Sequence, residues 1–150
     1  MKKKSNKIIS IIALIISAYF ANNYVKENNN PVTYQKETQY KSTSNKQLET
    51  LIKKRQSNVI ITLDARVINI LSDDNQGDRH QRMIVKSGKN TLLLAHNIDI
   101  APRVPVKKGD LLKVRGEYEW NDKGGVVHWT HRSTSSHADG WIIHNNKKYH

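Results

Sequence analysis

Apolar and polar residues alternate along most of the chain after residue 58, which is the pattern of half-buried β-strands. Five runs of this kind occur, at Val59–Leu71, His80–Lys86, Asn90–Ile98, Leu111–Trp120 and Val126–His131. The turn Asn121–Gly125 separates the last two runs, and its glycines permit the positive φ that a tight reversal needs. These two runs are therefore predicted to form a hairpin.

The number and spacing of the strands predict an all-β fold, a small five-stranded OB-like barrel. The first strand is long enough to bend, and Pro102 and Pro105 exclude a regular central strand from the connection between the third and the fourth. Both features match the five-stranded Greek-key barrel called the OB-fold. An open meander or an SH3-like barrel would give a similar pattern, because the closure of a sheet leaves no signal in a single sequence.

One short N-terminal helix and a C-terminal hairpin complete the predicted domain. Residues Ser44–Gln56 are predicted to be helical and to pack on the barrel through apolar side chains at helical spacing. These side chains are Leu48, Leu51 and Ile52. Residues 141–150, WIIHNNKKYH, have an Asn-Asn pair that tolerates left-handed geometry and predict a small hairpin. We expect Trp141 and Ile143 to share the face that packs on the end of the barrel.

An export signal is predicted ahead of the domain. Four lysines precede Ile8–Ala21, an apolar run of fourteen residues that is interrupted only by two serines. As a helix the run would span about 21 Å, short of the ~30 Å hydrocarbon core of a bilayer. Residues 1–21 are therefore predicted to be a signal peptide, with a retained membrane anchor as the alternative. Residues 22–43 are polar and are predicted to be a linker, and the domain of residues 44–150 would be periplasmic or extracellular.

Positive charge dominates the composition. The chain carries 25 Lys and Arg against 13 Asp and Glu, a net charge of +12, and about +8 remains without the four lysines of the signal. This charge favours a polyanionic partner, which single-stranded nucleic acid, anionic lipid and an acidic cell-envelope polymer satisfy equally. A charge that serves only solubility is the alternative. The absence of cysteine excludes disulfides and thiolate zinc sites, so any metal would be held by His, Asp or Glu.

Two polar groups interrupt the apolar strands, HQR at His80–Arg82 and HNID at His96–Asp99. Polar residues in such positions commonly form buried hydrogen bonds, and we expect these to hold the barrel together. A phosphate-handling set of Arg103, Asp99 and Glu117, by analogy with OB-fold nucleases, is the alternative.

Four sequence blocks occur in order between about Val59 and Tyr149: HQRMIV, LAHNIDIAPR, GEYEWNDKGGVVHWTH and DGWI. They resemble the signature of a bacterial family of small exported proteins that is known only as a domain of unknown function. The resemblance implies a single exported domain. It implies no activity and no functional residues.

The predicted site lies in Gly109–Trp141, which holds all three tryptophans and three of the seven histidines. OB-like barrels often present a strand face on which aromatic rings stack against bases or sugars while cations contact the backbone. Five residues have these chemistries and form the predicted ligand-binding set: Arg115, Trp120, His128, His131 and Arg132. Trp129 and Trp141 lie beside apolar strand residues and are predicted to belong to the core, which leaves Trp120 as the exposed tryptophan. The chain is thus predicted to be an exported binding module for a polyanion, nucleic acid or cell-envelope polymer, rather than an enzyme.

A metal-dependent hydrolase of phosphoesters or amides is the alternative function. Four residues have the ligand chemistry of a zinc site: His128, His131, His137 and Asp139. Glu117 or Glu119 would then be the base for a metal-bound water. The spacing speaks partly against this site, because His128 and His131 point to opposite faces of a flat strand unless a bulge or a strand end intervenes. The chain has no recognisable catalytic motif, and no cofactor other than this zinc is predicted.

Overall fold

The structure is a computed structural model that describes residues 44–133 and 137–150. The predicted signal and linker, residues 1–43, lie outside the described residues, so both remain predictions. Among the helices that the structure does describe, none is both long and apolar enough to cross a membrane.

One helix and seven strands follow one another along the described chain. The N-terminal helix covers residues 44–54. The strands are β1 (Val59–Ile70), β2 (His80–Ser87), β3 (Asn90–Asn97), β4 (Leu111–Glu119), β5 (Val126–His128), β6 (Trp141–His144) and β7 (Lys147–Tyr149). The helix, the first four strands and the closing hairpin agree with the predicted elements, whereas β5 ends three residues before the predicted strand does.

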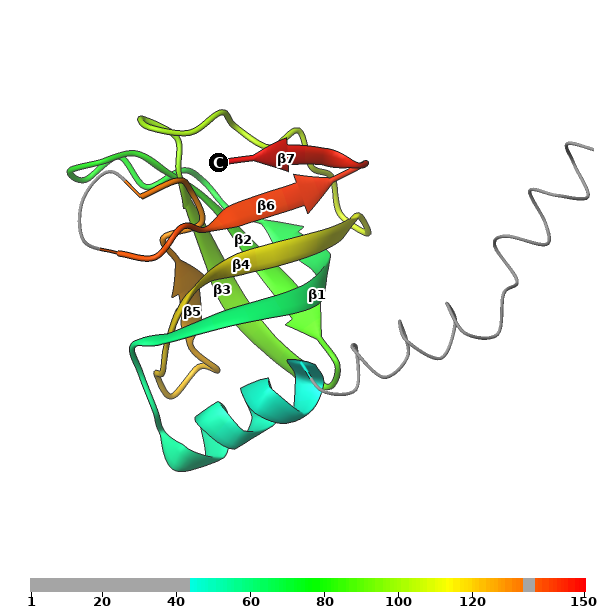
Figure 1. The fold of residues 1–150 in the computed structure, drawn as a ribbon. Coiled ribbons are helices and arrows are strands. Elements are labelled where there is room, and N and C mark those ends of the chain that lie inside the picture. The colour runs from blue at the N-terminus through cyan, green and yellow to red at the C-terminus, as the bar shows by residue number, and fades with distance from the viewer. Residues whose placement is uncertain (1–43, 134–136) are drawn as a thin grey trace, which may run out of the picture. The chain divides into compact units, whose positions relative to one another are not determined.

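The first five strands close into a barrel (Figure 1). They are arranged in the order β1-β2-β3-β5-β4, and β4 pairs back onto β1. β3 and β5 run parallel, while the other neighbouring strands of the barrel are antiparallel. This arrangement confirms the predicted five-stranded OB-like barrel.

β1 closes the barrel because it bends and thereby pairs on both of its edges. Residues Val59–Arg66 pair with β4, and the strand pairs with β2 from Arg66 onwards. The register with β2 shifts between Val67 and Asn69, where a β-bulge lies. A bulge bends a strand and increases its twist. The long first strand is therefore the element that turns an open sheet into a barrel.

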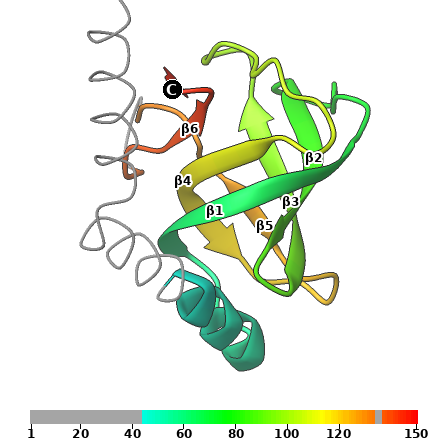
Figure 2. The same cartoon turned by 90° about the vertical axis from the view of Figure 1, so that its right-hand side faces the viewer.

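Apolar side chains that alternate along the strands fill the barrel interior. The buried apolar residues of the five strands are Ile61, Leu63, Ala65, Val67, Met83, Val85, Leu92, Leu94, Leu112, Val114, Tyr118 and Val127. The N-terminal helix covers one end of the barrel, as both views show (Figures 1 and 2). It buries Leu48 and Leu51 there, and Ile52 is partly buried against the same core. Each fully buried leucine contributes about 1.5–3 kcal/mol, so the helix is an integral part of the fold, as predicted.

The other end of the barrel is closed by buried hydrogen bonds to the β3–β4 connection. Gln81 Nε2 donates to the Val104 carbonyl at 2.8 Å, and the Val104 N–H donates to Gln81 Oε1 at 3.0 Å. His96, which pairs with Gln81 in the ladder, lies 3.1 Å from the Pro102 carbonyl through Nε2 and 2.8 Å from the Thr130 hydroxyl through Nδ1. A carbonyl only accepts, so Nε2 carries the proton and Nδ1 accepts from the hydroxyl. Burial lowers the pKa of His96 to about 4, so the side chain stays neutral at pH 7 and keeps this tautomer. The predicted buried hydrogen bonds of the two polar groups are thereby confirmed at Gln81 and His96.

β6 and β7 extend the sheet beyond the barrel, at the end opposite the helix (Figure 1). β6 pairs with β4, and Ile142 lies opposite Val114 with both side chains buried. Trp141 and Ile143 therefore point to the outer face, where both are half-buried. The prediction that these two residues pack on the barrel end is wrong, because the register with β4 turns Ile142 inward instead.

Candidate functional site

β5 ends at His128 because the backbone of Trp129 leaves the extended conformation. Trp129 has a φ of 49°, in the left-handed region that bulky side chains rarely adopt. This single residue reverses the alternation, so Thr130 is fully buried and Trp129 is 38% exposed. The predicted strand up to His131 and the predicted core position of Trp129 are therefore both wrong. A backbone held in this region costs on the order of 1–3 kcal/mol, which the surrounding structure must offset.

Two glycines hold the ends of the β5–β6 loop against β4. β5 pairs with the C-terminal part of β4 and β6 with its N-terminal part, and Gly116 lies between the two pairings. A Cβ at Gly116 would lie 2.3 Å from the His128 carbonyl oxygen, and one at Gly140 would lie 1.9 Å from the Trp129 carbonyl oxygen. A hydrogen bond of 2.8 Å from the Gly140 N–H to the His131 carbonyl closes the base of the loop. The loop is thus anchored at both ends by backbone contacts that no larger residue would allow.

Four rings gather at the end of β5 and on the described part of the β5–β6 loop, and we call them the ring cluster: His128, Trp129, His131 and His137. Trp129 stacks on His137 with ring centroids 4.5 Å apart, and it lies 5.4 Å from His128. His131 meets Trp129 edge to face at 5.7 Å and His137 at 4.9 Å. The structure therefore brings the three predicted histidines together, around the tryptophan that the sequence assigns to the core.

Backbone carbonyls fix the orientation of two imidazoles of the ring cluster. His131 Nδ1 donates to the Arg132 carbonyl at 2.7 Å, and His137 Nδ1 donates to the Ala138 carbonyl at 2.9 Å. Burial lowers the pKa of His131, so its Nε2 carries a lone pair at neutral pH. His137 Nε2 is shielded from solvent and has no hydrogen-bond partner in the described part of the chain.

His128 also faces two glutamates on the outer wall of the barrel, and these three residues form the Glu–Glu–His trio. The ladder pairs His128 with Glu117, and Glu119 lies two residues further along β4 on the same face. His128 Nε2 lies 3.5 Å from Glu119 Oε1, and one ligand atom from each residue of the trio lies within 4.8 Å of the other two. The same Nε2 atom is shielded from solvent and has no hydrogen-bond partner among residues 44–133 and 137–150.

The four residues of the predicted zinc site do not converge in this way. Asp139 Oδ1 accepts the backbone N–H of Ser133 at 2.7 Å and thereby braces the loop. Within the described ranges, the Glu–Glu–His trio is the one set of three His, Asp or Glu side chains whose ligand atoms lie within 4.8 Å of one another. Of the four predicted ligands, His128 alone belongs to it. The two glutamates, which the sequence suggested as a base, contribute the other ligand atoms.

Trp120 lies apart from the ring cluster, near the end of the N-terminal helix. It is half-buried and packs on the core, and the guanidinium carbon of Arg55 lies 5.0 Å from its ring centroid. The backbone N–H of Trp120 donates to the Ser57 hydroxyl at 2.9 Å. Trp129, not Trp120, is therefore the most exposed tryptophan. The prediction differed because it assumed an unbroken strand through position 129.

The predicted phosphate-handling set is not assembled. Arg103 pairs with Asp73, and Asp99 pairs with Arg79 at 2.7 Å. Glu117 belongs to the Glu–Glu–His trio instead. Arg103 and Asp99 therefore form ion pairs with residues of the β1–β2 connection and not with each other.

Cations surround Trp141 on the outer face of β4, β6 and β7. The ladder places Arg115 beside Trp141, and Lys113 lies two residues before Arg115 on the same face. Lys148 Nζ lies 5.8 Å from the centroid of the Trp141 ring. Arg115 Nε donates to the Asp139 carbonyl at 3.1 Å, which holds the guanidinium at the base of the loop.

Arg132 adds a further positive charge from the loop. The pKa of Asp139 is lowered first by the hydrogen bond from the Ser133 N–H and further by the charges of Arg132 and Lys148, so these two cations lie near the same carboxylate. Arg132 is exposed. We call this surface the basic face; it consists of Lys113, Arg115 and Lys148 around Trp141 and of Arg132 near the Asp139 carboxylate. Of the predicted ligand-binding set, Arg115 and Arg132 belong to it.

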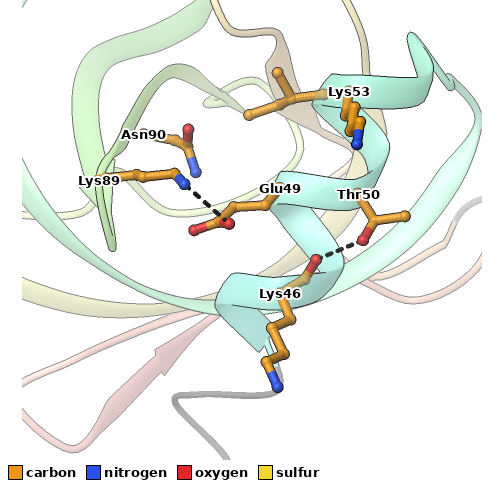
Figure 3. A pocket seen from close by; sticks show the side chains of 7 residues that line it. Lys46, Glu49, Thr50, Lys53, Lys89 and Asn90 are labelled. Atoms are coloured by element: carbon orange, nitrogen blue, oxygen red, sulfur yellow. Dashed lines mark hydrogen bonds and ion pairs between the residues drawn. The ribbon is translucent and has the colours of Figure 1, made fainter.

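A hollow of about 430 Å³ lies at the other end of the domain, beside the N-terminal helix (Figure 3). Its lining residues are Lys46, Glu49, Thr50, Ile52, Lys53, Lys89 and Asn90. Figure 3 shows Glu49 reaching from the helix to Lys89, with 3.1 Å between carboxylate and ammonium. This ion pair occupies the side of the hollow where the helix approaches the β2–β3 turn.

Sequence reasoning missed Trp141 and Lys148, and it did not recognise the glutamates as possible ligands, although β4 itself contains a signal. Its outward positions read Lys113, Arg115, Glu117 and Glu119, so the charge changes from positive to negative along one face of one strand. The positive half meets β6 and the negative half meets β5. The strand thus divides the outer wall into the basic face and the Glu–Glu–His trio.

The family model described as "Protein of unknown function (DUF3465)" matches residues 32–150. No curated protein matches the chain. The matched region contains the described domain and all four sequence blocks, which confirms the resemblance drawn from them. The chain belongs to the DUF3465 family.

Proposed function

We propose that this DUF3465 domain is a binding module for a linear polyanion and that the basic face is its contact surface. The position of Trp141 supports the proposal most strongly, because Arg115 flanks the ring on one side and Lys148 approaches it on the other. Aromatic rings in such surfaces stack on bases or sugar rings, while neighbouring cations contact phosphates or carboxylates.

The distribution of charge favours a binding surface over a charge that serves solubility alone. The domain from residue 44 onwards has 18 Lys and Arg against 11 Asp and Glu, a net charge of +7. Neighbouring strands lie about 4.8 Å apart, and residues two apart on a strand lie about 6.7 Å apart. Arg115, Lys113 and the cations beside them are therefore close enough for one polymer chain to contact several of them at once.

Single-stranded nucleic acid is the ligand class that this surface fits best, because each of its units offers both a flat base and a phosphate. The predicted export signal at residues 1–21 would bring the domain to the outside of the cytoplasm. An acidic envelope polymer is the other linear polyanion that it would meet there.

The experiment is a salt titration of binding between the full-length chain and a fluorescently labelled single-stranded oligodeoxythymidylate, followed by anisotropy. Arg115, Arg132 and Lys148, each neutralising one phosphate, predict a slope of about −2 for log K against log salt concentration. Trp141→Ala removes the stacking ring and should weaken binding by about 1–3 kcal/mol.

Matched charge reversals locate the surface. The pair Arg132→Glu and Lys148→Glu should weaken binding by about tenfold or more. The pair Lys53→Glu and Lys54→Glu makes the same change in net charge at the exposed end of the helix and should have a much smaller effect. Equal losses in the two double variants, or no binding to oligonucleotide and none to an acidic polysaccharide, would overturn the proposal. Binding to the polysaccharide alone, with the same pattern of variants, would assign the envelope polymer as the ligand.

A further inference from the structure

We propose that Glu117, Glu119 and His128 form a binding site for a borderline divalent metal ion, Zn²⁺ or a close relative, on the outer wall of the barrel. This inference is independent of the proposed polyanion binding. It also differs from the metal site predicted from the sequence, because it takes only His128 from that set.

The backbone positions these three side chains before any metal binds. Glu117 and Glu119 are two residues apart on β4, so both point outward from the same strand. His128 lies opposite Glu117 on β5, and side chains in paired positions of an antiparallel ladder have Cβ atoms about 4.5–5.5 Å apart. Two hydrogen-bonded strands of a closed barrel thus supply all three ligands, and neither strand has to move.

The distances fit a metal with small side-chain adjustments. One ligand atom from each residue lies within 4.8 Å of the other two. Zinc bonds of about 2.0–2.2 Å place tetrahedral ligands about 3.4 Å apart. The separation of 3.5 Å between His128 Nε2 and Glu119 Oε1 already has this value. A rotation of the Glu117 side chain would bring the third atom into place.

The electrostatics of the trio favour a cation. Two carboxylates share one face, and among the described residues no Lys or Arg nitrogen lies within 4.0 Å of either of them. The His128 Nε2 beside them is shielded from solvent, and within the described ranges it makes no hydrogen bond, although Glu119 Oε1 lies 3.5 Å away. An unsatisfied polar atom of this kind is costly in a folded protein, and a metal bound by all three side chains would satisfy it.

The donor set indicates which metals are favoured. Two carboxylate oxygens and one imidazole nitrogen suit Zn²⁺, Co²⁺ and Mn²⁺, whereas Ca²⁺ and Mg²⁺ prefer sites made of oxygen alone. Three protein ligands leave the fourth tetrahedral position for water or for an anionic group of a bound molecule. The ring of Trp129 lies 5.4 Å from that of His128, so its fluorescence should respond when His128 binds a metal.

The test begins with the full-length chain after treatment with a chelator. In one experiment Co²⁺ is titrated into the protein while the visible absorption of the bound ion is recorded. In a second experiment the binding of Zn²⁺ to the metal-free protein is measured by isothermal titration calorimetry. One ion per chain is expected, together with a change in tryptophan fluorescence that is absent in Trp129→Phe. Mg²⁺ and Ca²⁺ should neither bind measurably nor compete.

Paired variants separate the trio from the ring cluster. Glu119→Gln and His128→Gln should abolish Co²⁺ absorption and the rise in melting temperature caused by Zn²⁺. His137→Gln, a histidine of the ring cluster outside the trio, and Glu49→Gln, a glutamate on the helix, should retain both. Glu119 is half-buried on the outer wall, so Glu119→Gln should fold, and circular dichroism without metal checks this. The proposal fails if the wild type binds no Zn²⁺, or if binding survives Glu119→Gln and is lost in His137→Gln.

Discussion

A fall in pH from 7 to 5 should destabilise the domain, and His96 should account for most of the loss. Its side chain is fully buried, and both ring nitrogens are used in the neutral form. Burial lowers the pKa of His96 from 6.5 to about 4. Between these two values the unfolded chain binds a proton that the folded protein does not bind. The free energy of unfolding must therefore decrease as the pH falls through this window.

The magnitude follows from the two pKa values. Protonation of the unfolded state between pH 7 and pH 5 lowers the free energy of unfolding by about 2 kcal/mol for this one group, and the full loss near pH 4 approaches about 3 kcal/mol. The total free energy of unfolding of a small domain is about 5–15 kcal/mol, so a loss of this size is large enough to measure. The carboxyl groups whose pKa values are lowered, such as that of Asp110, titrate below this window and add little to it.

The assay is urea unfolding at pH 7 and at pH 5, followed by circular dichroism, for the wild type and for His96→Gln. The variant is expected to be less stable at pH 7, because it changes a buried hydrogen-bonded group. Its decrease between the two pH values should nevertheless be smaller than that of the wild type by about 2 kcal/mol. A residual decrease is expected from His131, whose pKa is also lowered by burial. If the variant and the wild type lose the same free energy between pH 7 and pH 5, His96 is not held neutral by burial and the reasoning is wrong.

Three further predictions concern Gly140, the helix residue Leu48 with Lys54 as its control, and the Asp110 carboxylate. Gly140→Ala should lower the free energy of unfolding by about 2 kcal/mol or more in urea titrations, because its Cβ meets backbone atoms that cannot move aside. Leu48→Ala should cost about 2–5 kcal/mol in the same measurement, whereas Lys54→Ala on the exposed side of the helix should change it by less than about 0.5 kcal/mol. The pKa of Asp110 is lowered by the N–H of residue 107 and then by His144, so its contribution to stability is present above pH 3.8 and lost below it. Asp110→Asn should accordingly be less stable than the wild type at neutral pH, and the difference should shrink in acid unfolding curves.

Much of the fold could be predicted from the sequence because it depends on local alternation. Residues 61, 63, 65 and 67 are apolar and buried, while the residues between them are less buried, and the same pattern marks the other strands of the barrel. Closure could not be predicted in this way. It depends on the bulge between Val67 and Asn69 and on the pairing of β1 with β4, which joins segments about fifty residues apart. A register shift changes no residue type, so a single sequence does not reveal it.

The position of Trp129 shows why the site was harder to predict than the fold. A reading based on alternation assumes that each residue stays extended, and Trp129 with its positive φ breaks that assumption. The cause lies partly in distant residues, since Gly116 and Gly140 let the loop lie close against β4. Because of this one dihedral angle, Trp129 is exposed and Thr130 is buried, the reverse of what alternation predicts. The exposed aromatic ring is therefore that of Trp129 and not that of Trp120.

The outer face of β4 combines what the sequence can predict with what it cannot. Alternation alone places Lys113, Arg115, Glu117 and Glu119 on one side of the strand. It does not say what stands beside them, because their neighbours come from strands that reach β4 only after the barrel has closed. β5 brings an imidazole to the glutamates, and β6 brings an indole to the arginine. The same four charges would be an ordinary solvated row beside any other strands. The chemistry of this surface therefore arises from the β5–β6 loop, which places two different partners on adjacent halves of one strand.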